Sequence, residues 1–373
     1  MSSHRIHNFG AGPAALPLPV LEQVREELLD FRGSGMSILE TSHRSARYTE
    51  VQEGAITLLR ELIGGAALGD GYEVLLMGGG ARTQFGLVPW NLMPPGGAAD
   101  YLVTGHWAEM AAAEGAKRGR VRVAWSSAST GHDRVPAPEE LAPGRIEPPL
   151  GGGAAYVHCT SNNTIYGTQL RAFPDPGGAP LVCDMSSDVL SGPLDLARFG
   201  LIYAGAQKNL GPAGVTVVIV RRDLLERSPA ELPDTLSYAR MAAKRSLLNT
   251  PPVFAVYVLG LVLRHLRDRG GLAAASGRNE EKAALLYRAI DGSGGFYRGH
   301  ARQESRSRMN VTFRLPSPEL EERFVAEAAA EGLAGLKGHR SVGGVRASLY
   351  NAVELESVRA LVGFMEDFAR RAG

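Results

Sequence analysis

The sequence predicts an α/β fold: a large domain with a mainly parallel seven-stranded sheet covered by helices, and a smaller α+β domain towards the C-terminus. Three observations predict it. The chain has 373 residues, which is too long for one simple core. Its middle alternates short apolar runs with helical segments, the pattern of parallel sheets covered by helices. After about Pro251 the pattern changes to long helices separated by single strands.

The apolar runs of the middle part are the expected strands. Several are continuously apolar, as expected of strands buried on both faces. The runs are 72–77, 99–105, 120–125, 154–160, 180–186, 201–206 and 214–220. Helical segments such as 106–119 lie between some of them. Towards the C-terminus we expect helices at 253–270, 278–291, 320–332 and 353–373, with strands at 309–315 and 345–351.

The composition excludes several classes of function. Forty basic residues balance 39 acidic ones, a net charge of +1, so there is no electrostatic footprint for nucleic acid. No run of about 18 uncharged apolar residues suggests a membrane span, and the N-terminal segment has no apolar region typical of a secretory signal. The two cysteines, Cys159 and Cys183, lie in apolar runs and indicate buried side chains in a reducing compartment, not a metal site. These features favour a cytoplasmic enzyme.

The segment LIYAGAQKNLGPAG, residues 201–214, is the first candidate for chemistry. Lys208 follows the end of a buried strand and is framed by small residues. Desolvation there lowers the pKa of the amine and makes it nucleophilic, as Schiff-base chemistry requires. A lysine that reaches from the strand end to solvent is an equally good interpretation of this segment alone.

Asp184, in PLVCDMSSDVL, ends another apolar run 208 − 184 = 24 residues before Lys208. Adjacent strands can bring the two residues together at their carboxyl ends, where open α/β sheets bind ligands. A carboxylate at that edge can pair with a protonated pyridine nitrogen. Taken alone, the residue fits a helix cap better.

Three further residues or motifs follow strands. The turn MGGGARTQF, residues 77–85, provides backbone amides and Arg82 for an anion, although such turns are common between a strand and a helix. Trp107 begins a helix and can stack on a flat ring, or fill the core. Thr164 can donate a hydrogen bond to a phenolate oxygen, or be an ordinary turn residue.

The segment GAGPAA, residues 10–15, superficially matches a dinucleotide-binding fingerprint. The preceding segment is too short and no βαβ unit surrounds it. We interpret it as a turn before the helix VLEQVREELLDF.

Together these motifs resemble one family. The order is GGGAR, HW, NNTI, DMSS and AGAQKN, closed by GHRSVGGVRASLYNA near the C-terminus. The chain resembles the phosphoserine aminotransferase family, which comprises class V aminotransferases of pyridoxal-phosphate (PLP) fold type I, over nearly its whole length. The resemblance implies a large PLP-binding domain over 16–265 and a small domain formed by 1–15 together with 266–373.

The resemblance also implies roles for individual residues. Lys208 would bind the PLP cofactor as a Schiff base, Asp184 would pair with the pyridine nitrogen, Trp107 would stack on the ring, and Thr164 would contact the phenolic oxygen. Four residues of this chain would hold the cofactor phosphate: Gly80, Ala81, Arg82 and Gln207. Asn249 and Thr250 would reach the same phosphate from the neighbouring subunit of a homodimer with a shared active site.

The substrates would be phosphoserine and 2-oxoglutarate, and both carry two anionic groups. Arginine suits such groups because its planar fork binds carboxylates and phosphates. By resemblance Arg346 binds the α-carboxylate, while the distal phosphate or carboxylate would meet His43, Arg44, His339 and Arg340. The alternative is that these arginines are ordinary surface residues.

The implied reaction transfers an amino group from O-phospho-L-serine to 2-oxoglutarate with ping-pong kinetics, in serine biosynthesis. Whether 4-phosphohydroxy-L-threonine is a second substrate stays open. The nearest rivals are an alanine–glyoxylate type of class V aminotransferase and a cysteine desulfurase, which would need a mobile reactive cysteine. More distant ones are a non-catalytic protein of the PLP fold and a nucleotide-binding protein that uses GGGAR. No metal site is expected.

Overall fold

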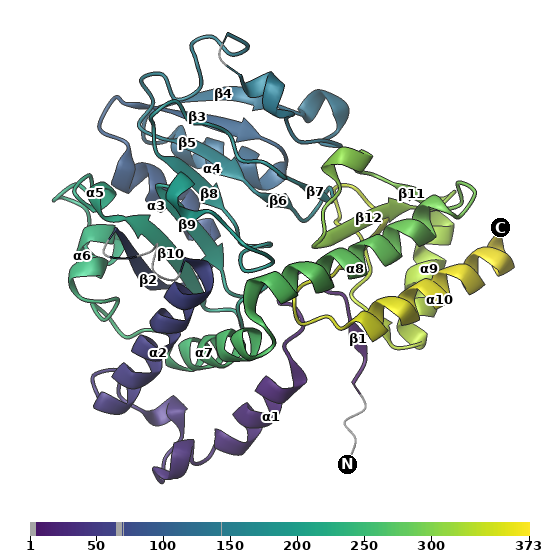
Figure 1. Ribbon diagram of the computed structural model, residues 1–373, viewed down its shortest axis with the longest axis horizontal. Helices are drawn as coiled ribbons and strands as arrows, with labels where there is room; N and C mark the ends of the chain where they lie inside the picture. Colours follow the sequence, from purple (N-terminus) through teal and green to yellow (C-terminus); the bar gives the residue numbers. More distant parts are fainter. Residues whose placement is uncertain (1–4, 65–68, 70, 143) are drawn as a thin grey trace.

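The centre of the molecule is a seven-stranded sheet with the strand order β2-β10-β9-β8-β5-β3-β4 (Figure 1). The computed structural model describes residues 5–64, 69, 71–142 and 144–373. Within the sheet every pairing is parallel except those of β10, which runs antiparallel to β2 and β9. The predicted mainly parallel sheet is confirmed, and each apolar run contributes one strand. The strands are β2 (Tyr72–Gly78), β3 (Ala98–Val103), β4 (Arg120–Ser126), β5 (Val157–Thr160), β8 (Leu181–Asp184), β9 (Leu201–Gly205) and β10 (Val215–Arg221).

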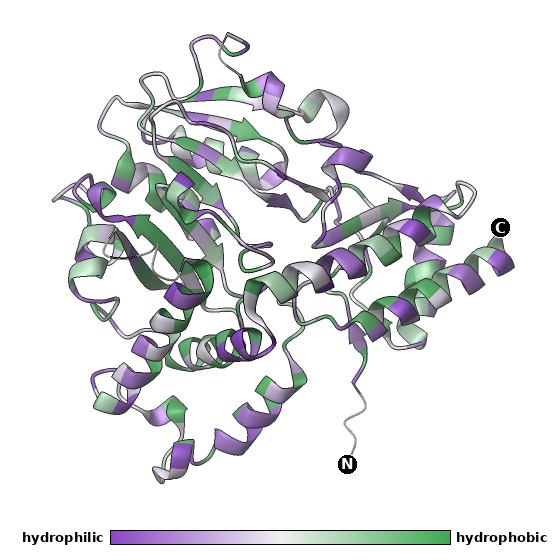
Figure 2. Cartoon of the chain, in the orientation of Figure 1, coloured by the Kyte–Doolittle hydropathy of each residue, from purple (hydrophilic) through white to green (hydrophobic). Residues whose placement is uncertain are grey.

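Both faces of this sheet are covered by helices, which explains why the runs are apolar throughout. Successive side chains of a strand point to opposite faces, and Leu75 and Leu76 of β2 accordingly belong to two different cores. Helices α2 and α7 supply one core, and α3 and α4 the other. Figure 2 shows the hydrophobic strands between these layers. The helices of this part are α1 (Leu18–Glu27), α2 (Ala46–Ile63), α3 (Arg82–Leu92), α4 (His106–Gly115), α5 (Arg222–Leu225), α6 (Tyr238–Ala243) and α7 (Val253–Asp268).

The C-terminal part has its own sheet and core. Strands β11, β12 and β14 form an antiparallel sheet in that order, and a third hydrophobic core fills the space between this sheet and helices α8, α9 and α10. The N-terminal strand β1 pairs in parallel with β13 and so joins this part. The elements are β1 (His7–Asn8), α8 (Gly271–Asp291), β11 (Arg298–Gly299), β12 (Asn310–Arg314), α9 (Pro318–Ala330), β13 (Leu333–Ala334), β14 (Val345–Ser348) and α10 (Leu355–Ala372). A short hairpin, β6 (Asn162–Asn163) with β7 (Thr168–Gln169), lies between the two parts of the chain (Figure 1).

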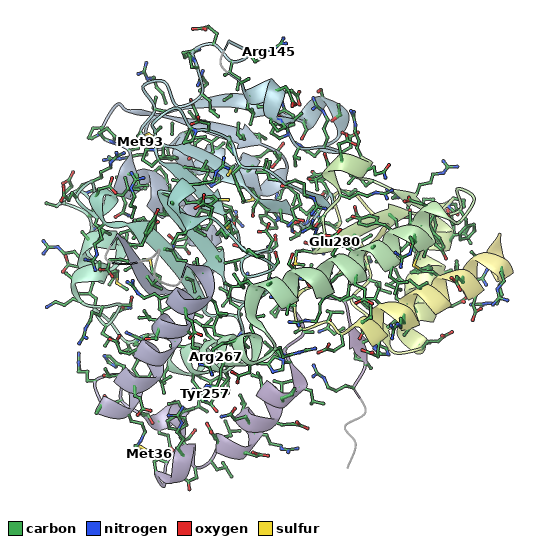
Figure 3. All side chains as sticks on the ribbon, in the orientation of Figure 1. Met36, Met93, Arg145, Tyr257, Arg267 and Glu280 are labelled. Carbon is green, nitrogen blue, oxygen red and sulfur yellow. The ribbon has the colours of Figure 1, made fainter. Side chains whose placement is uncertain are left out.

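A side-chain hydrogen bond links the outer helices α1 and α7, and both cysteines lie in the core. Tyr257, labelled in Figure 3, lies in α7, and its hydroxyl donates a 2.6 Å hydrogen bond to Glu27, the last residue of α1. Cys159 and Cys183 are fully buried and free, as predicted, and they face each other across β5 and β8.

No helix in the described ranges is both long and apolar enough to cross a membrane. Within those ranges, no group of His, Cys, Asp and Glu side chains is arranged to hold a metal ion.

Candidate active site

The predicted site residues gather at the edge of the sheet where the parallel strands end. Asp184 is the last residue of β8, and Lys208 lies 208 − 205 = 3 residues beyond the end of β9. Strands β8 and β9 are adjacent and parallel, as the spacing of the two residues predicted. The same edge receives the start of α3 after β2 and the start of α4 after β3. This edge is where open α/β sheets bind ligands.

Asp184 is a buried carboxylate that is held in one orientation. Its Oδ1 accepts hydrogen bonds from the backbone N–H of Ser186 at 2.9 Å and from the Ser186 hydroxyl at 2.6 Å. Burial raises the pKa of Asp184, and the charge of Lys208 and the bonds from Ser186 oppose that shift. With Oδ1 occupied, Oδ2 is the oxygen available to a cationic ligand group.

The amine of Lys208 lies against the aromatic ring of Trp107, with Nζ 5.9 Å from the ring centre. Burial lowers the pKa of Lys208, and the carboxylates of Asp184 and Asp188 partly compensate. Lowering the pKa increases the share of neutral amine, which is the nucleophilic and proton-accepting form.

Trp107, Thr164 and Arg346 form one connected group. The indole Nε1 of Trp107 donates to Oγ1 of Thr164 at 3.1 Å, and Nη1 of Arg346 donates to the carbonyl oxygen of Thr164 at 3.2 Å. Gly105, before α4, allows the side chain of Asn163 to approach closely, since a Cβ there would lie 2.7 Å from the side-chain oxygen of Asn163. Three residues that are distant in sequence are therefore joined into one group, and its Trp107 ring faces the Lys208 amine.

The glycine turn lies beside Gln207. A Cβ added at Gly205 would lie 2.6 Å from Oε1 of Gln207 and 3.2 Å from the Cβ of Ala81, so these two side chains are neighbours. Helix α3 begins at Arg82 without a side-chain cap, and the space beside Gly80 is open. Uncapped amides at a helix start facing open space are suited to a phosphate.

Arg346 presents a free edge of its guanidinium group. Only Nη1 has a hydrogen-bond acceptor among the described residues, and Nε is buried without one. Burial also lowers the pKa of Arg346. A buried donor without an acceptor costs free energy, so this edge is suited to an anionic ligand.

The remaining predicted residues lie apart from Lys208 within the chain. His43 and Arg44 lie in the loop before α2, and no contact in the described part of the chain joins them to Trp107 or Arg346. Asn249 and Thr250 are exposed. His339 is half-buried and Arg340 is exposed, on the loop between β13 and β14, and the positive charge of Arg346 helps to lower the pKa of His339. The last two therefore lie at the outer end of the group around Lys208.

Sequence reasoning missed Asp188, a second acid near Lys208, which is half-buried. Its carboxylate accepts hydrogen bonds from Ser161 and, at 3.0 Å, from Gln169. Burial raises the pKa of Asp188 to about 6, and those two bonds oppose the shift. Asp188 follows Asp184 by four residues in the sequence. Nothing in the sequence, however, distinguishes it from an aspartate in a solvated turn.

Comparisons with known proteins agree with this geometry. Residues 6–361 match the family model described as "Aminotransferase class-V". A phosphoserine aminotransferase of Desulfatibacillum aliphaticivorans is 54% identical over 372 residues, which cover 99% of each chain. The solved phosphoserine aminotransferase of Bacillus circulans subsp. alkalophilus is 52% identical with a TM-score of 0.95, covering 100% of both chains. A PLP-bound phosphoserine aminotransferase from Trichomonas vaginalis is 38% identical with a TM-score of 0.90, covering 97% of this chain and 100% of that one.

The fold and the edge around Lys208 are therefore those of a PLP-dependent class V aminotransferase, an enzyme that acts on small molecules. Within that class, the chain belongs to the phosphoserine aminotransferase family, as its motifs indicated.

The residues present fit PLP. Asp184 keeps one carboxylate oxygen for a pyridine nitrogen, the ring of Trp107 faces the Lys208 amine, and the open turn beside Gly80 and Gln207 suits the phosphate. The position of each group corresponds to one chemical feature of the cofactor.

Proposed function

We propose that this protein exchanges the amino group of O-phospho-L-serine with the oxo group of 2-oxoglutarate. The products are 3-phosphohydroxypyruvate and L-glutamate, and the step belongs to serine biosynthesis. The main observation behind this proposal is that the guanidinium group of Arg346 has a free edge and lies within electrostatic reach of Lys208. His339 and Arg340 lie on the loop beyond it. One cation beside the lysine and further cations outside it match a substrate with an α-carboxylate and a distal anion.

In the proposed mechanism the chain binds, orients and moves protons. Arg346 binds the α-carboxylate and so directs the Cα–H bond towards Nζ of Lys208. The cofactor, when bound, supplies the electron sink that makes this bond acidic. Asp184 would keep the pyridine nitrogen protonated, and Thr164 would donate to the phenolic oxygen. Nζ of Lys208 would take the Cα proton and deliver it to C4′ of the cofactor, and the second half-reaction would run the same transfer in reverse.

A half-reaction titration tests the proposal. Adding phosphoserine to the holoenzyme should convert the visible absorbance of the bound cofactor, and 2-oxoglutarate should restore it. Alanine at the same concentration is the matched control, since it has an α-carboxylate but no distal anion. If alanine converts the cofactor as readily as phosphoserine does, the substrate assignment is wrong.

We also propose a homodimer with a shared active site, in which the partner supplies His43, Arg44, Asn249 and Thr250. The position of His43 and Arg44 away from Lys208 in one chain supports this. Mixing inactive Lys208→Ala and Arg44→Ala subunits tests it, because each hybrid dimer would contain one intact site. Random mixing should restore about a quarter of the wild-type activity, whereas an unshared site would give none.

Three further proposals concern the domain boundaries, the cellular location and the substrate range. The division into 16–265 and 1–15 with 266–373 is supported by the separate C-terminal core, and its boundary falls in the last turn of α7; residues 1–4 lie outside the described ranges. A cytoplasmic location is supported by two cysteines that remain free although they face each other. We extend the substrate range to 4-phosphohydroxy-L-threonine, which carries the same two anions and can be tested in the same titration.

A further inference from the structure

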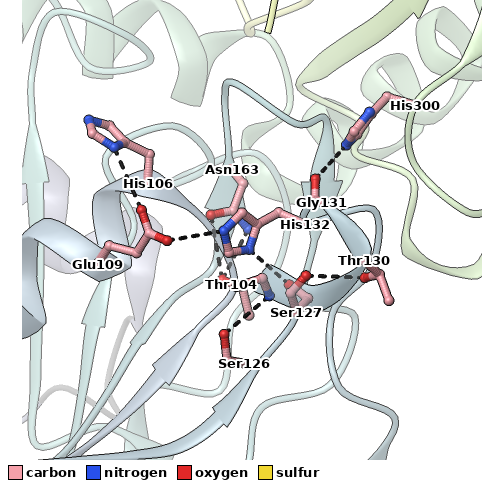
Figure 4. Close-up of polar contacts among 11 residues, drawn as sticks. Thr104, His106, Glu109, Ser126, Ser127, Thr130, Gly131, His132, Asn163 and His300 are labelled. Carbon is pink, nitrogen blue, oxygen red and sulfur yellow. Dashed lines mark hydrogen bonds and ion pairs between the residues drawn. The ribbon is translucent and has the colours of Figure 1, made fainter. Parts of the chain in front are cut away.

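A chain of polar side chains leads from the protein interior to the outer end of the site. Oε1 of Glu109 lies 3.2 Å from Nε2 of His132, and Oε2 lies 3.8 Å from Nδ1 of His106. Figure 4 shows the Glu109 carboxylate between the two imidazole rings. His106 is the first residue of α4 and directly precedes Trp107.

His132, the inner end of this chain, is rigidly held. It is 5% exposed, its Nδ1 lies 3.1 Å from the hydroxyl of Ser127, and its ring packs on Tyr166 at 4.8 Å. Its backbone has φ of 58°, a left-handed conformation that is uncommon for residues other than glycine. If the Ser127 hydroxyl donates to Nδ1, then Nε2 carries the proton and donates to Glu109. His132 thereby holds the Glu109 carboxylate from the interior side.

The outer end of the chain faces His339. The rings of His106 and His339 lie 6.3 Å apart with 37° between their planes. Nδ1 of His339 lies 2.7 Å from the hydroxyl of Ser341, and Nδ1 of His106 faces Glu109. In the described part of the chain no residue is hydrogen-bonded to Nε2 of either ring. The Nε2 edges of both rings are thus available to a ligand.

Positive charges act on His339, the outer of the two rings. Partial burial lowers the pKa of His339, and so do the positive charges of Arg346, His106 and Arg340. Glu109 is the acidic residue that faces His106, and its other oxygen is occupied by His132. The guanidinium groups of Arg346 and Arg340 both act on His339, so a multiply charged anion bound beside the two rings would be stabilised electrostatically.

We propose that His106 is a further substrate-binding residue, which donates a hydrogen bond from Nε2 to the distal phosphate of the substrate, and that Glu109 is the residue that positions it. This inference rests on the proposed function, since it takes phosphoserine as the substrate. A phosphate has more charge and more acceptor oxygens than the carboxylate of glutamate. His106 therefore favours the phosphorylated substrate over the other amino-acid substrate.

Kinetics of the holoenzyme test the proposal. In His106→Ala the KM for phosphoserine should rise about tenfold, as expected for the loss of one charge-assisted hydrogen bond at a half-exposed site, while kcat stays nearly constant. The KM for glutamate should rise less. The matched control is His300→Ala, because His300 belongs to the same cluster and contacts the carbonyl oxygen of Gly131 at 3.0 Å (Figure 4). That variant should leave both KM values unchanged.

Glu109 needs a test that separates positioning from simple structural support. Glu109→Gln should raise the KM for phosphoserine in the wild-type background. It should have no further effect in His106→Ala, because Glu109 acts through that ring. An equal effect in both backgrounds would remove Glu109 from the proposal.

A direct binding measurement completes the test. Inorganic phosphate, titrated into the holoenzyme by calorimetry, should bind about tenfold more weakly to His106→Ala than to wild type or to His300→Ala. If wild type does not convert phosphoserine, the proposed function fails. If wild type converts it and His106→Ala keeps the same KM and the same phosphate affinity, the function stands and the role of His106 is refuted.

Discussion

Replacing Arg346 by lysine keeps the positive charge and removes only the planar fork. In the structure Nη1 of Arg346 is engaged by the carbonyl oxygen of Thr164, while Nε is buried with no acceptor among the described residues. Nε and Nη2 are therefore the pair of donors left for a carboxylate. Because a lysine ammonium is a point donor, it can satisfy one carboxylate oxygen at this position but not both.

The magnitude follows from the number of bonds lost. A hydrogen bond to a charged group contributes about 1.5–3 kcal/mol. Losing one of two should lower kcat/KM by roughly 10- to 150-fold, and losing both in Arg346→Ala by roughly 10²- to 10⁴-fold. The carboxylate is bound in the ground state as well as in the transition state, so most of the loss should appear in KM.

Steady-state kinetics with phosphoserine and with glutamate measure the effect. Both substrates carry an α-carboxylate, so Arg346→Lys should penalise both by the same factor, unlike the substitution of His106. Arg359→Lys, on the exposed side of α10, is the matched control and should change neither. Unchanged kcat/KM values for Arg346→Lys, or a loss confined to phosphoserine, would refute the assignment of the α-carboxylate to this residue.

Three other substitutions test the interior of the site. Lys208→Ala should abolish turnover and the visible absorbance of the lysine-bound cofactor, and a variant that kept both in a spectrophotometric assay would exclude this lysine. Asp184→Asn keeps the shape and the hydrogen bonds from Ser186 but loses the charge; kcat should fall by roughly 10- to 150-fold, matching a charged hydrogen bond of about 1.5–3 kcal/mol, with cofactor retained. Burial raises the pKa of Asp188 to about 6, above its unfolded value, so this carboxyl stabilises the fold fully below about pH 4, and that contribution is lost as the pH rises through 6. The difference in unfolding free energy between wild type and Asp188→Asn, from denaturant titrations, should therefore shift in favour of the variant from pH 4 to pH 7, and a pH-independent difference would contradict the reasoning.

The sequence predicted the strands well for a physical reason. A strand buried on both faces must be apolar throughout, and such runs are short and easily bounded, as in β9 and β10. What it did not predict is the strand order or the reversed direction of β10. Those depend on which strands pair across the sheet, and an apolar run carries no such information.

Candidate residues were predictable where chemistry and strand ends coincide. Asp184 and Lys208 each end an apolar run, and the adjacency of β8 and β9 follows the expected pattern. The relation of Glu109 to His132 was not predictable, because it joins α4 to a loop beyond β4 through a contact between side chains. Lys282 is a further example: it is 2% exposed and donates to three backbone carbonyls, from Leu349, Tyr350 and Val353, at 2.8–2.9 Å. A lysine in a helix is usually solvated, so only the fold identifies it as a buried ammonium that holds the chain after β14.

On the proposed function, the arrangement of donors around Lys208 explains how one site would accept two different amino acids and reject small ones. Arg346 lies within electrostatic reach of Lys208 and is the residue proposed to bind the α-carboxylate, whereas His339, Arg340 and His106 are grouped on the outer side. A substrate with one anion leaves the positive charge of Arg340 and the hydrogen-bond donors of the two imidazoles without an anionic partner. A substrate with two anionic groups would pair with Arg346 at one end of the site and with the outer group at the other. It would thereby bind in one orientation, with Cα turned towards the amine of Lys208. On this proposal, selectivity for dianionic amino acids would arise from the separation of Arg346 from the outer group, and the alanine control in the half-reaction titration measures it directly.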